Sequence, residues 1–242
     1  MDEKTARCLS DLTTDFYRHV STSFSATRQT SWPGWLRLVG EAGLVAGEEV
    51  DVLDLACGNA RFERFLAGQG LVVSSWAVDG CDELADLASV PDGCHLSYQR
   101  MDITRTLLDG RGLSAAIDAP PCDLAVSFGF LHHVPGQDLR ALVLDALVDH
   151  VRPGGVVAVS LWQFARDDRL LAKAMPVEGG DEGDYLLGWQ DRTDVRRYCH
   201  SFSEDEVDEL AASCRGRASE VARFSADGRT ADLNRYLLLR RR

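Results

Sequence analysis

The sequence predicts an α/β fold, in which a mostly parallel sheet carries helices on both faces and ends in an antiparallel β-hairpin. Three observations lead to this prediction. Short apolar runs alternate with amphipathic stretches from residue 51 to residue 162. A glycine-containing turn joins the first run to the stretch that follows it. Arg217–Phe224 and Asn234–Arg240 have strand-like composition and flank Asp227-Gly228, as in a hairpin.

The stretch Asp51–Asp79 contains the turn around which the fold is organised. Asp51–Cys57 is a short apolar run, as expected of a strand that is covered on both faces, and Gly58-Asn59 breaks it. Apolar residues at helical spacing follow, and a second apolar run ends at Asp79. Ligands of such sheets bind outside the carboxyl ends of the strands, so Gly58 and Asp79 mark the predicted site.

The turn after the first strand also indicates what kind of ligand binds. It has one glycine, whereas a pyrophosphate requires close backbone approach at several, so the dinucleotide fingerprint is absent. The phosphate-binding pattern G-x-x-x-x-G-K-[ST] is absent as well. An acid at the end of the second strand still suits a ribose, because its two oxygens accept hydrogen bonds from both hydroxyls. A ribose without phosphates indicates a nucleoside cofactor such as S-adenosylmethionine (SAM).

Five segments, in order along the chain, resemble motifs of the class I SAM-dependent methyltransferases. Val52–Arg61 (VLDLACGNAR) is similar to motif I, with Ala56 and Ala60 in place of two glycines, and Asp79 matches the ribose acid. The other three are Met101-Asp102-Ile103, the adenine motif; Cys122–His133, the fourth strand and the loop beneath the sulfonium; and Val151–Ser160, the fifth strand.

This resemblance implies a Rossmann-like, seven-stranded, mostly parallel sheet and SAM as the cofactor. The residues that it implies for cofactor binding are Asp54, Ala56, Gly58, Asp79, Gly80, Met101, Asp102, Ile103, Ser127 and Phe128. From the residues alone, Asp54 more readily orients the turn than contacts a ligand, and Asp102 equally suits a helix N-cap.

A closer resemblance is to the tRNA methyltransferases that esterify 5-carboxymethyluridine at the wobble position. It rests on FSATRQTSWPGW (Phe24–Trp35), FGFLHHV, GDYLLGWQDRTDVRRYCHSF (Gly183–Phe202) and NRYLLLR (Asn234–Arg240). The resemblance implies a small zinc-binding activator subunit as a partner. It implies Arg28, His132 and His133 as catalytic residues, and Trp32, Arg196, Arg197, Tyr198 and His200 as substrate-binding residues.

We expect a single domain of residues 1–242 with four parts. Residues 1–40 are expected to form a helical lid that includes a helix over Ala6–Ser23, and residues 51–162 to form the cofactor-binding core. Residues 163–202 are a substrate-side insertion, since Trp162–His200 has no clear period and is too long for a simple connection. Residues 203–242 form a helix, with Ser203 and Glu206 in a capping box, and the hairpin.

Charge is unevenly distributed along the chain. The net charge of −12 opposes nucleic-acid binding. From Arg215 onward, however, eight arginines face three acidic residues, which is +5, so residues 1–214 carry −17. The arginine-rich end is either a local phosphate-contacting patch or a solvated face.

The cysteine pattern and the hydropathy of the chain indicate a cytoplasmic location. Seven scattered cysteines without a C-x-x-C pair favour reduced thiols in a cytoplasm over disulfides or a zinc site, so no metal is expected. No run approaches the roughly 20 apolar residues needed to span a bilayer, and the polar start of the chain lacks a signal-peptide pattern.

Three functions therefore stay open. The first is methylation of a carboxymethyl-type uridine in tRNA. A carboxylate acceptor is ionised at neutral pH and needs no general base, which suits a site with arginine and histidine but no obvious lysine or aspartate base. The second is methylation of a small metabolite or natural product, which the acidic surface favours. The third is a silent SAM-binding partner, which the reduced glycines at Ala56 and Ala60 favour.

Overall fold

A computed structural model describes residues 1–190 and 192–242. Asp191, within the Gly183–Phe202 segment singled out above, lies outside the described residues. No helix in the described part of the chain is long and apolar enough to cross a membrane.

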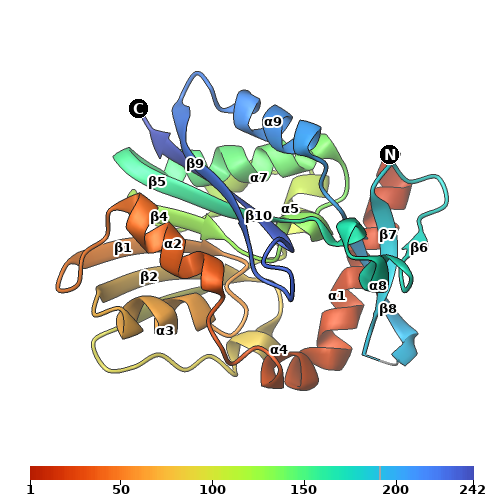
Figure 1. The fold of residues 1–242 in the computed structure, drawn as a ribbon, viewed down its shortest axis with the longest axis horizontal. Helices are drawn as coiled ribbons and strands as arrows, with labels where there is room; N and C mark the ends of the chain where they lie inside the picture. The colour runs from red at the N-terminus through yellow and green to blue at the C-terminus, as the bar shows by residue number, and fades with distance from the viewer. Residues whose placement is uncertain (191) are drawn as a thin grey trace.

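The main sheet has the predicted α/β architecture. Its strands are β1 (Glu49–Leu55), β2 (Val72–Asp79), β3 (His95–Arg100), β4 (Cys122–Ser127), β5 (Val151–Trp162), β9 (Ala218–Ala226) and β10 (Asn234–Arg241). They lie in the order β3-β2-β1-β4-β5-β10-β9 (Figure 1). The strands β1 to β5 run parallel to one another, and β10 is antiparallel to both β5 and β9. The seven-stranded sheet with its C-terminal hairpin is therefore confirmed.

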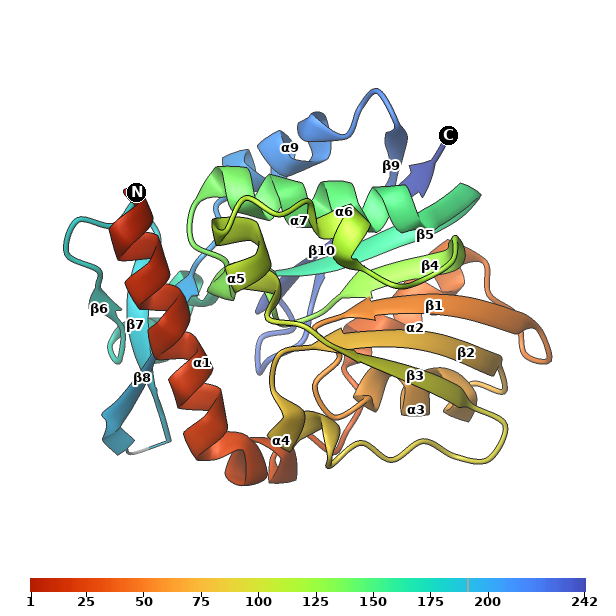
Figure 2. The same ribbon diagram turned by 180° about the vertical axis from the view of Figure 1, so that it is seen from behind.

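Helices cover both faces of this sheet (Figures 1 and 2). α2 (Pro33–Ala42) and α3 (Arg61–Gly68) lie on one face, and α5 (Ile103–Leu108), α6 (Leu113–Ala116), α7 (Gln137–His150) and α9 (Glu204–Ser213) lie on the other. Successive residues of β1 alternate between the two cores: Val52 packs beneath α2 and α3, and Leu53 packs on the opposite side. The capping box of α9 between Ser203 and Glu206 is confirmed.

Two of the predicted helices have different lengths in the structure. α1 spans Glu3–Ala26, beyond the predicted Ala6–Ser23, because Asp2 caps it by accepting a hydrogen bond from the Thr5 amide at 3.0 Å. The helix predicted over Cys81–Ser89 is limited to α4 (Asp82–Ala85). Val90-Pro91 follows it, and a residue before proline disfavours helical backbone.

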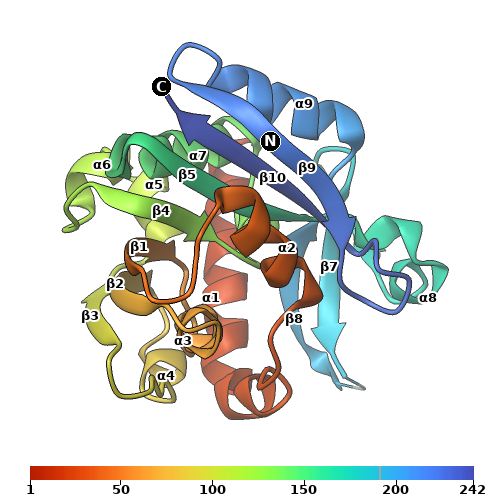
Figure 3. The same cartoon turned by 60° about the vertical axis from the view of Figure 1, so that its left-hand side comes forward.

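Residues 163–202 form a small second sheet rather than an irregular insertion. After the 3-10 turn Phe164–Arg166 and α8 (Asp168–Leu171), the strands β6 (Met175–Pro176), β7 (Asp184–Trp189) and β8 (Arg192–His200) pair antiparallel. The sequence pattern missed β8 because its last four residues are all buried, polar ones included, so apolar and polar residues do not alternate. This sheet packs against α1 at the carboxyl edge of the main sheet (Figure 3).

Candidate active site

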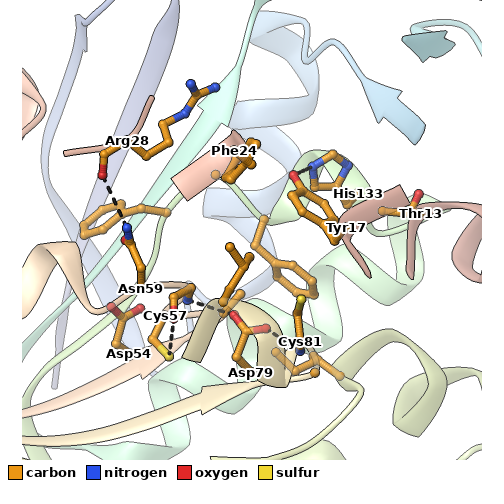
Figure 4. Close-up of a pocket in the computed structure, with 18 of the residues that line it drawn as sticks. Thr13, Tyr17, Phe24, Arg28, Asp54, Cys57, Asn59, Asp79, Cys81 and His133 are labelled. Carbon is orange, nitrogen blue, oxygen red and sulfur yellow. Dashed lines mark hydrogen bonds between the residues drawn. The ribbon is translucent and has the colours of Figure 1, made fainter. Parts of the chain in front are cut away.

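A cavity of about 190 Å³ lies between α1 and the carboxyl ends of the main strands. The turn after β1, the end of β2, the start of α5 and the loop after β4 contribute to its walls. Figure 4 shows the side chains that line it. Eleven residues predicted from the sequence are among them: Arg28, Trp32, Asp54, Ala56, Gly58, Asp79, Gly80, Asp102, Ile103, Phe128 and His133.

The turn after β1 has the backbone of a ligand-binding loop although two of its glycines are alanines. Ala56, Gly58 and Ala60 have φ values of 71°, 56° and 53°, which lie in the left-handed region. Each alanine there costs roughly 1–2 kcal/mol. The fold therefore holds this turn in the left-handed conformation even with alanine at two of its positions.

Asp79 ties the turn to the end of β2. Its Oδ2 accepts a hydrogen bond from the Gly58 amide and its Oδ1 one from the Cys81 amide, both at 2.8 Å. Burial raises the pKa of Asp79, and these amide donors oppose that rise. Each carboxylate oxygen keeps a further lone pair, so the group can still accept hydrogen bonds from two neighbouring hydroxyls.

Gly80 is required where β2 and β3 end. A Cβ at this position would lie 3.2 Å from the Cα of Asp102 and 3.3 Å from the carbonyl oxygen of Met101. A side chain would therefore push the two chain segments apart beside Asp79, at the cavity wall.

The floor of the cavity is rich in buried carboxyl groups. Burial, followed by the nearby Glu63 and Asp79, raises the pKa of Asp54 well above its usual range. Glu63 is fully buried and accepts a hydrogen bond from the Ser75 hydroxyl at 2.9 Å. Arg61 acts to lower the pKa of Asp54 and Arg64 that of Glu63, but burial outweighs both, so the floor suits a cationic ligand group.

Three arginines line the cavity, and of these Arg28 and Arg61 form no ion pair among the described residues, whereas Arg18 pairs with Asp15. The guanidinium of Arg28 lies 4.6 Å from the centre of the Phe24 ring, and that of Arg61 lies 5.0 Å from both Trp32 and Trp35. Their side-chain hydrogen bonds go to neutral oxygens of neighbouring threonines, and no carboxylate of the described residues pairs with either guanidinium. Burial lowers the pKa of both, that of Arg61 to about 10, which still leaves two positive charges at neutral pH.

His133 lines the cavity as a neutral side chain. Its Nδ1 lies 2.6 Å from the carbonyl oxygen of Tyr198, and its Nε2 lies 2.8 Å from the hydroxyl of Tyr17. Burial, with the like charge of Arg197, lowers the pKa of His133 to about 3. His132 lies behind it, stacked between His133 and Trp162, and does not line the cavity.

His132, His133 and Cys199 also lie close enough together to be considered as metal ligands, with their donor atoms within 4.8 Å of one another. Both ring nitrogens of His133 are already engaged in the hydrogen bonds above, however. We therefore assign no metal to this group.

The model of the family described as "Methyltransferase domain" matches residues 25–213. This chain belongs to that family.

Curated relatives of this methyltransferase include a putative methyltransferase of Encephalitozoon cuniculi, 28% identical over 81% of this chain and 82% of the relative. The tRNA (carboxymethyluridine(34)-5-O)-methyltransferases of Macaca fascicularis and Arabidopsis thaliana are 24% and 26% identical over 69% and 66% of this chain. The match spans only 22% and 35% of the length of those two proteins.

Solved structures share the fold of this methyltransferase. A DhpI complex with S-adenosylhomocysteine (SAH) has a TM-score of 0.59 at 21% identity, covering 96% of this chain and 97% of that one. The magnesium protoporphyrin IX methyltransferase of Synechocystis, with bound SAH, has a TM-score of 0.61 at 14% identity and covers 95% and 98%. Family and fold together make this protein a SAM-dependent methyltransferase, with SAM as its cofactor.

The acidic floor of the cavity, together with Arg28 and Arg61, fits this cofactor. SAM carries a sulfonium, an ammonium and a carboxylate beside its ribose. A buried acid whose pKa is raised by missing counter-charge suits the two cations, and Asp79 has spare acceptor capacity for the ribose hydroxyls.

Some residues predicted for the site of the methyltransferase do not line the cavity. Met101 lies in the core, and the Ser127 hydroxyl donates to the carbonyl oxygen of Leu55 at 2.8 Å. Arg196 contacts the sulfur of Met175 on the second sheet, and Arg197 lies over Phe16. The predicted substrate residues Arg196, Arg197, Tyr198 and His200 therefore do not line the cavity, since the last three are buried and Arg196 is partly exposed on the second sheet.

Tyr198 and His200 belong instead to a buried polar network that joins the second sheet to the core. The Tyr198 hydroxyl donates to Asp184 Oδ1 at 2.6 Å and accepts from Arg140 at 2.7 Å. The Nδ1 of His200 lies 2.7 Å from Asp184, and its Nε2 lies 2.7 Å from Glu206. Both ring nitrogens thus face carboxylate oxygens, and the Arg140 guanidinium lies 3.6 Å from oxygens of the same two carboxylates.

This network should make the methyltransferase sensitive to acid. Burial acts to raise the pKa of Glu206, but hydrogen bonds from His200 and Ser203 outweigh it and lower the pKa to about 2. Because the folded-state value lies below the ordinary value of about 4.3, this stabilisation is complete above that value and is lost as pH falls toward 2. In acid unfolding followed by circular dichroism, Glu206→Gln should flatten the decline between pH 5 and 2, whereas Glu209→Gln, an exposed control on the same helix, should not.

Several residues that line the cavity were not singled out as site residues from the sequence, and three of them matter for the argument. They are Tyr17 on α1, and Asn59 and Arg61 at the turn after β1. The only signal for Asn59 and Arg61 is their position next to Gly58. Tyr17 gives no local signal, since its role depends on His133, 116 residues away.

Proposed function

We propose that this methyltransferase transfers the methyl group of SAM to a carboxylate, and that the acceptor is a carboxymethyl-type uridine in tRNA. The observation that carries the proposal is the pair of arginines at the cavity, Arg28 and Arg61, which no carboxylate of the described residues neutralises. Such a pair is unexpected in a protein with a net charge of −12 unless it meets an anion. The names of the tRNA methyltransferases among its relatives support this choice of acceptor.

The residues around the cavity suggest how each ligand is held. In this proposal Asp79 accepts the ribose hydroxyls, and the turn from Ala56 to Gly58 with Asp54 faces the methionine part of SAM. Gly80, Asp102, Ile103 and Phe128 surround the adenine. Asp102 already accepts from the Arg105 amide at 2.9 Å as the N-cap of α5, so only its second oxygen is available to the adenine amino group.

The chemistry needs alignment more than proton transfer. SAM would supply an activated methyl group, and a carboxylate oxygen would attack the methyl carbon in line with its bond to sulfur. The oxygen–carbon bond would form as the carbon–sulfur bond breaks, and the sulfur would keep the electron pair. No proton moves, because the acceptor is already ionised. Arg28 can orient the carboxylate through paired N–H donors, and the neutral His133 is not needed as a base.

The N-terminal segment is proposed to act as a lid over these ligands. The Asn59 side-chain amide donates to the Ser25 hydroxyl at 2.9 Å and contacts the carbonyl oxygen of Arg28 at 3.4 Å. These contacts, one of which Figure 4 shows, connect the end of α1 to the turn after β1, called the cofactor turn below. Trp32 continues the same segment along the cavity wall and would contact the substrate.

The test is methyl transfer to tRNA from a strain that lacks the methyltransferase gene. Nucleoside mass spectrometry should show a new methyl ester that mild alkali removes. Arg28→Met should lower kcat/KM for tRNA by about 100-fold, the loss of one charge-assisted pair of hydrogen bonds. Arg37→Met, an exposed arginine on α2 outside the cavity, serves as the matched control. An alkali-stable product, or equal effects of the two variants, would contradict the carboxylate assignment.

An anionic small molecule is the second candidate acceptor. It is favoured because the C-terminal arginines that could bind tRNA phosphates mostly pair within the protein. Arg217, Arg223 and Arg235 form ion pairs with acidic residues of the protein itself, and Arg240 and Arg241 bind backbone carbonyls. The phosphate-contacting patch considered from the sequence is therefore largely engaged internally. Labelled SAM offered with tRNA, with and without a small zinc-binding activator subunit, and then with a metabolite extract separates the two acceptors. Tight SAM binding without transfer to any fraction would favour the non-catalytic reading.

A further inference from the structure

Tyr17 lies on the lid helix α1 and lines the cavity together with His133. Figure 4 shows the two side chains pointing toward each other, on the opposite side of the cavity from Asp54 and Asn59. The Tyr17 ring is held edge-on between Phe16 and Phe24, at centroid distances of 5.2 and 5.1 Å. Its position is therefore fixed by packing on one side and by His133 on the other.

The direction of the hydrogen bond between Tyr17 and His133 follows from the other side of the imidazole. The Nδ1 of His133 lies 2.6 Å from a backbone carbonyl oxygen, which can only accept, so Nδ1 carries the proton. In a neutral imidazole the remaining nitrogen, Nε2, has a lone pair and no proton. The hydroxyl of Tyr17, 2.8 Å away, must therefore donate its hydrogen to Nε2.

This arrangement determines what the Tyr17 oxygen can do. Its single hydrogen is committed to His133, so the oxygen presents only lone pairs to any other group. It cannot donate to a carboxylate acceptor, and a carboxylate has no hydrogen to give it. In the proposed placement the ammonium of SAM meets the acidic floor and the ribose hydroxyls meet Asp79. The methyl group on the sulfonium, which has polarised C–H bonds and a positive charge, is then the group that suits such an oxygen.

We propose that Tyr17 is a further catalytic residue, whose hydroxyl oxygen contacts the methyl group of SAM and favours the charged cofactor over its uncharged product. His133 acts as the positioning residue, because it holds the hydroxyl hydrogen away from the cavity. The inference rests on the proposed placement of SAM in this cavity and is independent of which acceptor receives the methyl group.

The test compares the affinities of SAM and SAH by calorimetry, without any acceptor. Tyr17→Phe should weaken SAM binding by about tenfold, as expected for one charge-assisted weak hydrogen bond, and should change SAH binding by less than about twofold. The ratio of the two affinities is insensitive to a general loss of cavity structure, which would affect both ligands. Tyr185→Phe removes a hydroxyl from a tyrosine on β7 outside the cavity and is the matched control.

Two variants of His133 test the positioning role. Glutamine can place an oxygen near the position of Nε2 and still accept from Tyr17, so His133→Gln should retain most of the preference for SAM. Asparagine reaches only the position of Nδ1, so His133→Asn should lose it. An unchanged ratio in Tyr17→Phe, or an equal loss for SAM and SAH, would overturn the inference. Because no acceptor is present, neither result bears on the tRNA proposal.

Discussion

Replacement of Arg140 by methionine should lower the free energy of unfolding by about 3–5 kcal/mol, the cost of breaking a buried ion pair from one side. Arg140 is 3% exposed. Its guanidinium donates to the carbonyl oxygen of Val134 and to the Tyr198 hydroxyl, and it lies 3.6 Å from carboxylate oxygens of both Asp184 and Glu206. Without it, the carboxylates of the buried Asp184 and the partly buried Glu206 lose the positive charge that lies between them.

Urea unfolding followed by circular dichroism measures this effect. Arg166→Met is the control, because Arg166 forms a half-exposed ion pair with Glu204 near the same junction and should contribute less than about 1 kcal/mol. A loss below about 1 kcal/mol in Arg140→Met would show that the network carries no net interaction. The same variant should reduce methyl transfer, since Tyr198 both belongs to the network and accepts from His133 at the cavity.

Asp79→Ala should weaken SAM binding by about 1–3 kcal/mol, which is roughly 5-fold to 150-fold, for the hydrogen bonds to the ribose alone. A further loss is expected because the Gly58 and Cys81 amides lose their shared acceptor, and the cofactor turn is then free to change shape. Asp79→Asn keeps one carbonyl oxygen as an acceptor, so its SAM affinity should lie between those of the wild type and Asp79→Ala. Titration calorimetry with SAM gives these values directly.

Asp82→Ala provides the control for Asp79. Asp82 follows within three residues but points outward, where it pairs with Arg100. Its replacement should leave SAM affinity within about twofold, the usual range for a surface change. Equal affinities of the wild type and Asp79→Ala would rule out Asp79 as the ribose acceptor, and with it the placement of the cofactor proposed above.

The sequence determined the main fold and the location of the cofactor turn because both depend on local pattern. The apolar run Asp51–Cys57, the break at Gly58 and the acid at Asp79 follow from strand burial and turn chemistry within a single βαβ unit. The hairpin around Asp227-Gly228 and the capping box of Ser203 and Glu206 are likewise local. A few neighbouring residues carry each of these signals.

The tertiary structure alone decided which side chains meet at the cavity and which are turned inward. Tyr17 and His133 come together from positions 116 residues apart, and no local pattern predicts such a pair. Tyr198 and His200 suggested a substrate cluster, but they are buried, because their polar groups find partners on α7, α9 and β7. Chain packing sets these long-range partners, and only they decide whether a polar residue stabilises the core or faces a ligand.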